Sequence, residues 1–167
     1  MLTRVSSVAE ASEAARAGAR FVDAGTDEAL VLAIRQAGLG VLICGTGAAA
    51  DLGRDNGNAA RQLLCAGPAE ADLAARRGIA RDRIVVQVTA SEAADTVRAG
   101  WLTLVDVDGD IAVASGVARA GATAAVCAWL GVSLISTRYV AEVRRCLDMT
   151  ESIRGARLPA WAVRGLG

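Results

Sequence analysis

Three aspartates at alternate positions are the most chemically suggestive feature of this chain. Asp106, Asp108 and Asp110 follow an apolar run within residues 102–110, which read LTLVDVDGD. Active sites of α/β proteins lie at the carboxyl ends of parallel strands, so carboxylates placed there indicate a ligand site. Oxygen ligands of this kind also bind Mg²⁺ or Ca²⁺. The structural alternative is a polar turn in which Asp110 caps a helix that starts at Ile111.

Asp23 and Arg138, at the ends of two other apolar runs, complete the set of candidate ligand-binding residues. Arg138 follows the run at residues 132–135, and its planar guanidinium suits a phosphate or a carboxylate. A salt bridge at the rim of the fold is the structural alternative for Arg138. The candidate ligand-binding residues are Asp23, Asp106, Asp108 and Arg138. We assign no catalytic residue, no metal ligand and no cofactor.

The charged residues exclude most common enzyme mechanisms. The chain has 18 basic and 18 acidic residues and no histidine, and every basic residue is arginine. Without His or Lys, the chain lacks an imidazole base, a Schiff-base or Walker-type lysine and a histidine metal ligand. The net charge of zero gives no overall attraction to nucleic acids or anionic membranes, so neither is an expected partner.

Other sequence features predict a cytoplasmic protein. No apolar run reaches the roughly 18 residues that a membrane span needs, and residues 1–4 do not resemble the start of a secretory signal. Cys44, Cys65, Cys127 and Cys146 are far apart, and three of them lie in apolar runs. This is typical of buried free thiols in a reducing compartment, and it argues against a zinc site.

Residues 45–50, GTGAAA, follow an apolar run and match a short dinucleotide-binding pattern. The pattern arises easily in a chain rich in Ala and Gly, and no acidic residue stands at the distance where a ribose would need one. We therefore interpret residues 45–50 as a simple loop.

Short β-branched runs alternate with helical stretches, which indicates a parallel sheet covered by helices. Strands are expected at residues 20–24, 41–44, 62–65, 83–88, 102–105 and 132–135. Helices are expected at residues 7–17, 27–37, 69–77, 91–100, 111–120 and 140–153, with 123–130 ambiguous and 45–58 irregular. A complete eight-unit barrel usually needs roughly 200 to 250 residues. We therefore predict an α/β fold, a TIM-type parallel (β/α) barrel trimmed to about six or seven units, as one domain over residues 1–155 with a loose tail at 156–167.

Three stretches of the chain resemble dihydropteroate synthases, the pterin-binding barrels of folate synthesis. Residues 9–25, AEASEAARAGARFVDAG, are similar to a helix ending in GA that leads into a short strand of that family. Residues 78–88, GIARDRIVVQV, resemble the beginning of a later strand, and residues 122–155 resemble the last strand and helix. The resemblance implies a TIM-type barrel that dimerises through its late helices. It supplies no counterpart for the family's first strand, so we expect that strand to be missing.

The positions that the resemblance aligns with the family's binding site are changed in this chain. The pterin-binding Asp falls on Gln87, and the Asp that ends the family's third strand falls on Cys44. The Arg and His that bind substrate phosphate fall on Ser136 and Arg138, and the pterin-binding Lys has no counterpart. Each hydrogen-bond partner left unmade in a dry pocket costs about 1 to 3 kcal/mol. We therefore do not expect dihydropteroate synthase activity.

Two hypotheses follow from this resemblance and its departures. The first is a non-catalytic, dihydropteroate-synthase-like pseudoenzyme that acts as a binding, scaffold or regulatory subunit, as a homo-oligomer such as a homodimer or with an active paralogue. The second is an enzyme whose remodelled carboxylate and arginine pocket acts on a pterin-like or phosphorylated small molecule, with one carboxyl protonated and one ionised.

Overall fold

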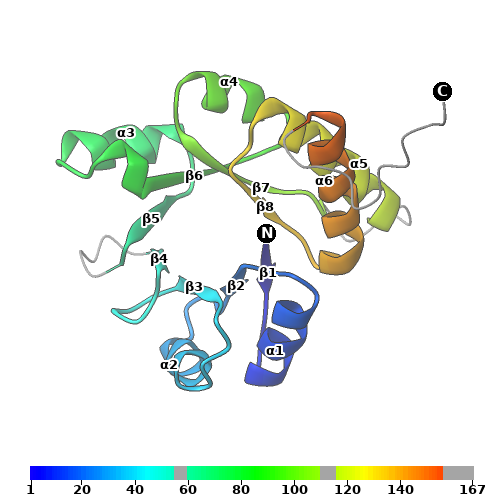
Figure 1. The fold of residues 1–167 in the computed structure, drawn as a ribbon. Coiled ribbons are helices and arrows are strands. Elements are labelled where there is room, and N and C mark those ends of the chain that lie inside the picture. The colour runs from blue at the N-terminus through cyan, green and yellow to red at the C-terminus, as the bar shows by residue number, and fades with distance from the viewer. Residues whose placement is uncertain (55–59, 110–115, 156–167) are drawn as a thin grey trace.

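The computed structural model describes residues 1–54, 60–109 and 116–155, which form a closed barrel of parallel strands (Figure 1). Neighbouring strands follow one another in chain order, and β8 pairs with β1 to close the ring. The strands are β1 (Leu2–Arg4), β2 (Phe21–Asp23), β3 (Leu42–Gly45), β4 (Leu52–Gly53), β5 (Gln62–Cys65), β6 (Ile84–Val88), β7 (Leu102–Asp106) and β8 (Leu134–Ser136).

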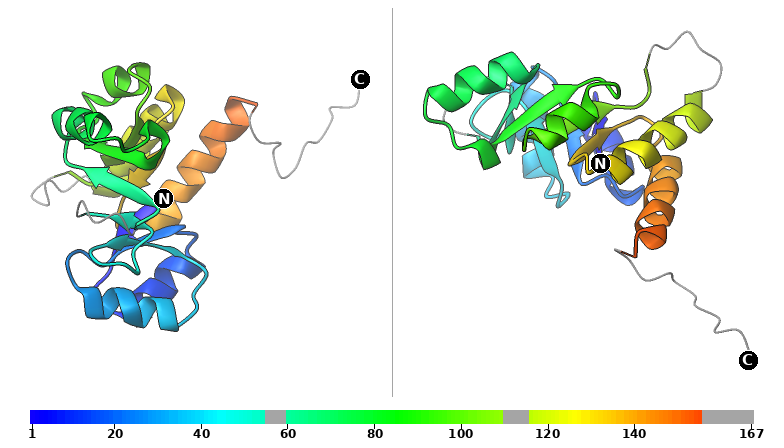
Figure 2. Two further views of the ribbon diagram at one scale, coloured as in Figure 1. Left: turned by 90° about the vertical axis from the view of Figure 1, so that its left-hand side faces the viewer. Right: turned by 90° about the horizontal axis from the view of Figure 1, so that it is seen from above.

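Helices of the described residues surround the barrel (Figure 2). They are α1 (Val8–Arg16), α2 (Glu28–Gln36), α3 (Pro68–Arg76), α4 (Ala93–Arg98), α5 (Gly116–Leu130) and α6 (Val140–Ile153), with a 3-10 turn at Arg81–Arg83. The connection from β3 to β4 has no helix, which lets the chain complete a barrel with few residues.

The predicted TIM-type α/β barrel is confirmed, but the expected number of strands is wrong. The barrel has eight strands rather than six or seven, and the first strand that we expected to be missing is β1. Leu2 of β1 pairs with Phe21 on one side and with Ser136 on the other. The other overlooked strand is β4, two residues long, within the stretch expected to be irregular. β1 and β4 have one large apolar residue each, Leu2 and Leu52, so no apolar run marks them as it marks the equally short β2 and β8.

The barrel is filled by apolar side chains. One cluster contains residues of alternate strand positions that face the interior: Leu2, Cys44, Leu52, Leu64, Val85 and Leu104, with Phe21, Leu102 and Leu134 against them. Two further clusters lie between the outer surface of the strands and the helices. The interior is therefore a packed core, and polar chemistry is confined to the ends of the barrel.

Local sequence signals explain where most helices begin. The Ser7 hydroxyl and the Asp27 carboxylate accept hydrogen bonds from backbone N–H groups in the first turns of α1 and α2, and Pro68 begins α3. The helix expected at 91–100 begins later, at Ala93, with Glu92 at the N-cap position, and the Glu92 carboxylate accepts hydrogen bonds from Thr89.

Several remaining expectations concern loops and the end of the chain. The ambiguous stretch at 123–130 is helical, as part of α5, whereas residues 111–115 and the tail at 156–167 lie outside the described residues. Residues 46–51 form a loop, and Gly45 before them packs so closely on Val31 that a Cβ would lie 2.8 Å from its methyl group. The four cysteines are free, and Cys146 alone among them is only half-buried. Within the described residues, no helix has the length and apolar character to cross a membrane.

Candidate functional site

Polar side chains form a layer at the carboxyl ends of the strands, above the apolar interior. Side chains on a strand alternate between its two faces, so the residue two positions after an inward-facing apolar residue also faces inward. The residues placed in this way are Arg4 on β1, Asp23 on β2, Gln87 on β6, Asp106 on β7 and Ser136 on β8. This is the end of a parallel barrel at which active sites lie, so this layer is the candidate site.

Asp23 is paired with an arginine that the sequence analysis did not single out. Arg54, one residue after β4, places its Nη2 2.6 Å from Asp23 Oδ2 and its Nε 3.4 Å from Oδ1. The backbone N–H of Gly25 donates a third bond, at 2.9 Å, to Oδ1. The Asp23 side chain is 8% exposed and that of Arg54 33% exposed. The carboxylate is therefore neutralised from within the chain and is not available as a free base.

Cys44 lies beneath this ion pair, at the position where the resemblance leads one to expect an aspartate. It is paired in register with Asp23 of the neighbouring strand. The pKa of the Cys44 thiol is raised to about 12, first by burial and then by the nearby negative charge of Asp23, against the opposing effect of Arg54. Because the thiolate is the nucleophilic form, Cys44 is protonated and unreactive near neutral pH.

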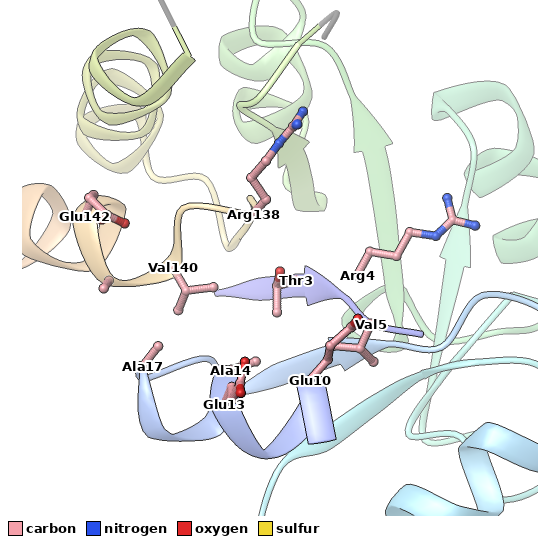
Figure 3. A pocket seen from close by; sticks show the side chains of 11 residues that line it. Thr3, Arg4, Val5, Glu10, Glu13, Ala14, Ala17, Arg138, Val140 and Glu142 are labelled. Carbon is pink, nitrogen blue, oxygen red and sulfur yellow. The ribbon is translucent and has the colours of Figure 1, made fainter. Parts of the chain in front are cut away.

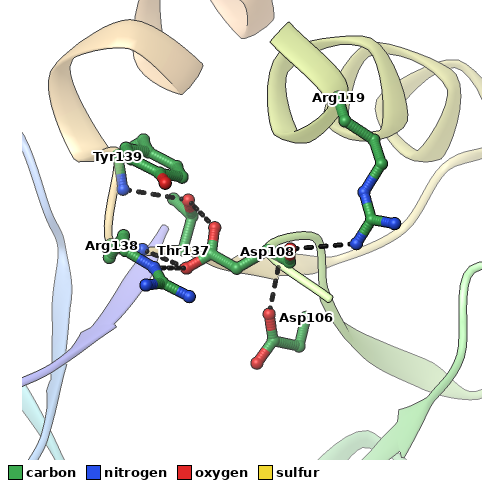
Figure 4. Close-up of polar contacts among 6 residues, drawn as sticks. All are labelled: Asp106, Asp108, Arg119, Thr137, Arg138 and Tyr139. Carbon is green, nitrogen blue, oxygen red and sulfur yellow. Dashed lines mark hydrogen bonds and ion pairs between the residues drawn. The ribbon is translucent and has the colours of Figure 1, made fainter. Parts of the chain in front are cut away.

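Asp108 joins the ends of two neighbouring strands (Figure 4). Its Oδ1 accepts a hydrogen bond from Thr137 Oγ1 at 2.5 Å, and its Oδ2 accepts bonds from Arg138 N at 2.7 Å and Arg138 Nε at 3.2 Å. The Thr137 hydroxyl in turn accepts a bond from the N–H of Tyr139. Asp108 thus ties the segment after β7 to the segment that leads into α6.

Two more side chains support this junction. Arg119 of α5 donates to the backbone oxygen of Asp108 at 3.0 Å, and Asp106 Oδ1 accepts from the N–H of Asp108 at 2.9 Å. The guanidinium of Arg138 also lies 5.5 Å from the centre of the Tyr139 ring. Of this group, Asp106 has an exposed carboxylate.

The structure brings together some of the predicted site residues and separates another. Asp108 and Arg138 form the salt bridge that was the structural alternative for Arg138, and Asp106 lies beside them. Asp23 belongs to a different ion pair, with Arg54. Asp110 lies outside the described residues, so its predicted capping role is not addressed. The ligand-binding role of the four candidates stays a prediction.

The sequence analysis missed four residues that shape the site. These are Arg4, Arg54, Arg119 and Thr137. Thr137 lies beside Arg138, so the strand-end argument used for Arg138 extends to it. Arg54 follows a strand of two residues in a stretch rich in Gly and Asp, where nothing signals a strand end.

Metal binding has no support from the described side chains. Among residues 1–54, 60–109 and 116–155, no group of three or more His, Cys, Asp or Glu side chains is arranged to hold a metal ion. Asp23 and Asp108 already accept bonds from arginine and from backbone N–H groups, which leaves a cation little of either carboxylate.

Comparison with solved structures relates the barrel to known folds. The Mycobacterium tuberculosis protein Rv1207 matches with a TM-score of 0.69 at 22% identity, over 95% of this chain and 92% of that chain. A Yersinia pestis dihydropteroate synthase bound to a pterin–sulfa conjugate matches with a TM-score of 0.70 at 14% identity, over 94% of both chains. A Xanthomonas albilineans dihydropteroate synthase in complex with 7,8-dihydropteroate matches with a TM-score of 0.72 at 14% identity, over 92% of both.

The fold is that of dihydropteroate synthases. Similarity at these identities shows the fold alone, and neither a family-level comparison nor a search of curated proteins finds a match to the sequence. Within this dihydropteroate synthase fold, Gln87 lies half-buried near the end of β6, and Cys44 lies buried in β3. The positions that the resemblance aligns with the pterin-binding Asp and with the Asp that ends the family's third strand therefore carry an amide and a protonated thiol.

Proposed function

We propose that this chain is a non-catalytic barrel with the dihydropteroate synthase fold, which acts as a binding, scaffold or regulatory subunit by associating with a second copy of itself. The observation that carries the proposal is an apolar surface on α5 and α6. The buried free thiols favour a reducing compartment, so we place this activity in the cytoplasm.

The state of the barrel mouth supports the non-catalytic part of the proposal. Asp23 and Asp108 are each engaged by an arginine and by backbone N–H groups. The chain has no His or Lys that could take over general base catalysis, and the Cys44 thiol stays protonated. Apart from Asp106, whose carboxylate is exposed, the described carboxylates and the thiol at the barrel mouth are thus engaged in internal contacts or protonated.

α5 has the composition of a helix that is covered on every side. Arg119 is its only charged residue among fifteen, whereas every other α-helix of the described residues has an acidic residue in its first turn. A helix that is apolar all round is typical of a buried position. Yet Val126 and Trp129 of α5 are 60% and 58% exposed. One face of α5 is therefore left to be covered by a partner.

The exposed face continues onto the neighbouring helix. α5 and α6 pack side by side, and Arg154 beyond α6 donates to the Ala128 oxygen at 2.5 Å and lies over the Trp129 ring. We define the α5–α6 patch as Val126, Trp129, Leu130, Met149 and Ile153, all of them exposed. Apolar residues gathered on adjacent helices are typical of interaction sites, especially where polar residues surround them.

A second copy of the chain suits this patch better than a charged partner. Exposed residues of both signs, Arg145, Glu151 and Arg154, lie among the patch residues of α6 and at its end. Across a two-fold axis, such mixed charges can pair with their counterparts on an identical surface. The net charge of zero means that two copies do not repel one another.

The test compares the solution mass of the wild type with that of two variants by multi-angle light scattering. The wild type is expected at twice the 17.0 kDa chain mass, and Trp129→Glu is expected to raise the dimer dissociation constant by at least ~30-fold. The matched control is Leu32→Glu, which places the same charge at a comparably exposed apolar residue of α2. A wild type that stays monomeric at about 100 µM, alone and with an active dihydropteroate synthase, would contradict the proposal.

A second candidate function rests on side chains of the polar layer at the carboxyl ends of the strands that have no ion-pair partner. The side chains of Arg4, Gln87 and Ser136 make no hydrogen bond or ion pair with another described residue, and the Asp106 carboxylate is exposed. These groups could recognise a pterin-like or phosphorylated small molecule. A thermal-shift titration with pterins and sugar phosphates tests this function. A ligand shift that is lost in Asp106→Ala or Arg4→Ala would support it, and no shift of the wild type would contradict it.

A further inference from the structure

The α5–α6 patch lies where α6 ends and residues 156–167 begin. Arg154 donates a hydrogen bond to a backbone oxygen in the last turn of α5, so the carboxyl ends of the two helices are adjacent (Figure 2). Trp129 and Ile153 of the patch lie at these ends, and the described residues stop at Gly155. The segment that follows therefore starts beside an apolar surface.

The residue after α6 turns the chain off the helix axis. Gly155 has a φ of +73°, a left-handed conformation that glycine adopts without strain. Its N–H donates to the Ser152 oxygen, and the N–H of Arg154 donates to the Thr150 oxygen, which closes the helix. After a left-handed residue at a helix end, the next residue commonly packs against the last turn. A path back along α6 is therefore favoured for the segment that follows.

Residues 156–167 have a composition that suits this surface. They read ARLPAWAVRGLG and contain no acidic residue. Their larger apolar side chains are Leu158, Trp161, Val163 and Leu166. Burying these side chains against the apolar patch removes both surfaces from water, which is the main favourable contribution to association. The segment and the patch are thus chemically complementary.

The segment is also long enough to cross the patch, and it carries a charge that suits the far end. Glu142, in the first turn of α6, lies two turns before the patch residue Met149 and on the same side of the helix (Figure 3). Residues 156–164 span about 30 Å when extended, more than the roughly 20 Å along α6 from Gly155 to Glu142. Arg164 therefore comes within reach of the exposed Glu142 carboxylate, which makes no ion pair within the described residues.

We infer that residues 156–167 cover the α5–α6 patch of their own chain and compete there with a second copy. Leu158 and Trp161 pack on the patch, and Arg164 pairs with Glu142. The same chain is the favoured occupant because a segment attached at Gly155 is present at an effective concentration on the order of 1 mM. The consequence, that this cover lowers the fraction of dimer, rests on the proposed function.

Oxidation of Met149 by hydrogen peroxide measures the cover directly, because a methionine reacts according to the exposure of its sulfur. Met149 is 66% exposed among the described residues. The full chain is treated at about 1 µM, where a second copy is dilute. Peptide mass spectrometry follows Met149 and the other methionine, Met1, which packs against the core and serves as an internal reference.

Variants of the segment should change this rate. The Leu158→Ser, Trp161→Ser double variant should oxidise Met149 about fivefold faster than the wild type, whereas Trp161→Phe should retain the wild-type rate. The matched control is Leu73→Ser, which removes an exposed apolar side chain from α3 and should change nothing. Equal rates in the wild type and the double variant would overturn the inference. Protection of the wild type that arises only at higher protein concentration would overturn it too, because a second copy would then provide the cover.

Light scattering separates this inference from the proposed function. If the segment competes with a second copy, the double variant should dimerise about tenfold more tightly than the wild type. Fast oxidation of Met149 in a double variant that stays monomeric at about 100 µM would support the cover and contradict the proposed self-association. Fast oxidation with an unchanged dimer dissociation constant would overturn the competition.

Discussion

Asp108 receives three hydrogen bonds at the junction of β7 and β8, while Asp106, two residues earlier, has an exposed carboxylate. Asp108 therefore stabilises the junction, whereas the Asp106 carboxylate is exposed to solvent. Asp108→Asn should lower the free energy of unfolding by about 1 to 3 kcal/mol, because an amide loses the charge-assisted bonds from Arg138 and Thr137. Asp106→Asn should cost less than about 1 kcal/mol. Urea unfolding measures both, and equal losses would show that the junction does not depend on Asp108.

Cys44 predicts how stability depends on alkaline pH. The pKa of its thiol is about 12 in the folded chain against the ordinary value of 9.0. Between these values the folded state holds more protons than the unfolded state, so its contribution to stability is complete below pH 9 and declines as pH rises toward 12. The decline has a slope of at most about 1.4 kcal/mol per pH unit.

Cys44→Ala should remove this contribution and make the unfolding free energy less sensitive to pH above 9. Urea unfolding of both proteins between pH 8 and pH 10 provides the comparison. Cys65 and Cys127 also have raised pKa values, because burial disfavours their thiolates, and they remain in both proteins. Identical slopes for wild type and variant would contradict the role of Cys44.

Single residues also show what the sequence could and could not predict about the site. The rim salt bridge was one of two interpretations of Arg138, since an arginine after a strand reaches either a ligand or a neighbouring carboxylate. The partner of Asp23 was not predictable, because Arg54 is 31 residues away and follows a two-residue strand. Long-range charge pairing depends on the closed barrel and leaves no local signal in the sequence.

Among the described helices, α5 and α6 make the most extensive helix–helix contact, and a glycine permits it. A Cβ on Gly121 of α5 would lie 2.9 Å from Cys146 Sγ of α6. Gly121→Ala in the wild type gains helix propensity but forces Cys146 to shift, so we expect little or no stabilisation. In the Cys146→Ala background the same change should stabilise the chain by about 1 kcal/mol.

The double-mutant cycle of Gly121→Ala and Cys146→Ala measures this contact directly. A coupling free energy of at least about 0.5 kcal/mol is expected, because the two side chains compete for one space. Additive effects within about 0.3 kcal/mol would show that α5 and α6 are not closely packed at this position.

Helices were predicted from the sequence more fully than strands. α6 has the expected bounds, and α1 and α2 each begin one residue after the expected starts at 7 and 27. β1 and β4 were missed because each has a single large apolar residue and is defined by hydrogen bonds to its neighbours, whereas the equally short β2 and β8 carry two adjacent apolar residues. The stretch that became α5 was ambiguous for a related reason, because a run that is apolar all round has no helical period.

For the whole molecule, both the composition and the surface favour a role in association rather than in catalysis. A neutral chain with no His or Lys retains the dihydropteroate synthase fold, while the strand ends carry ion pairs, an amide and a protonated thiol. Its unusual surface is the α5–α6 patch rather than a reactive pocket. The proposed role therefore depends on self-association, and the fraction of associated chains rises with protein concentration.

Hydrogen–deuterium exchange of the unmodified chain at increasing protein concentration tests this central proposal most directly. Because association would cover the α5–α6 patch, peptides from Gly116–Leu130 and Val140–Ile153 should exchange more slowly as concentration rises. Peptides from Glu28–Gln36, which contain the control residue Leu32, should not change. Exchange of α5 and α6 that is independent of concentration would contradict self-association through this patch.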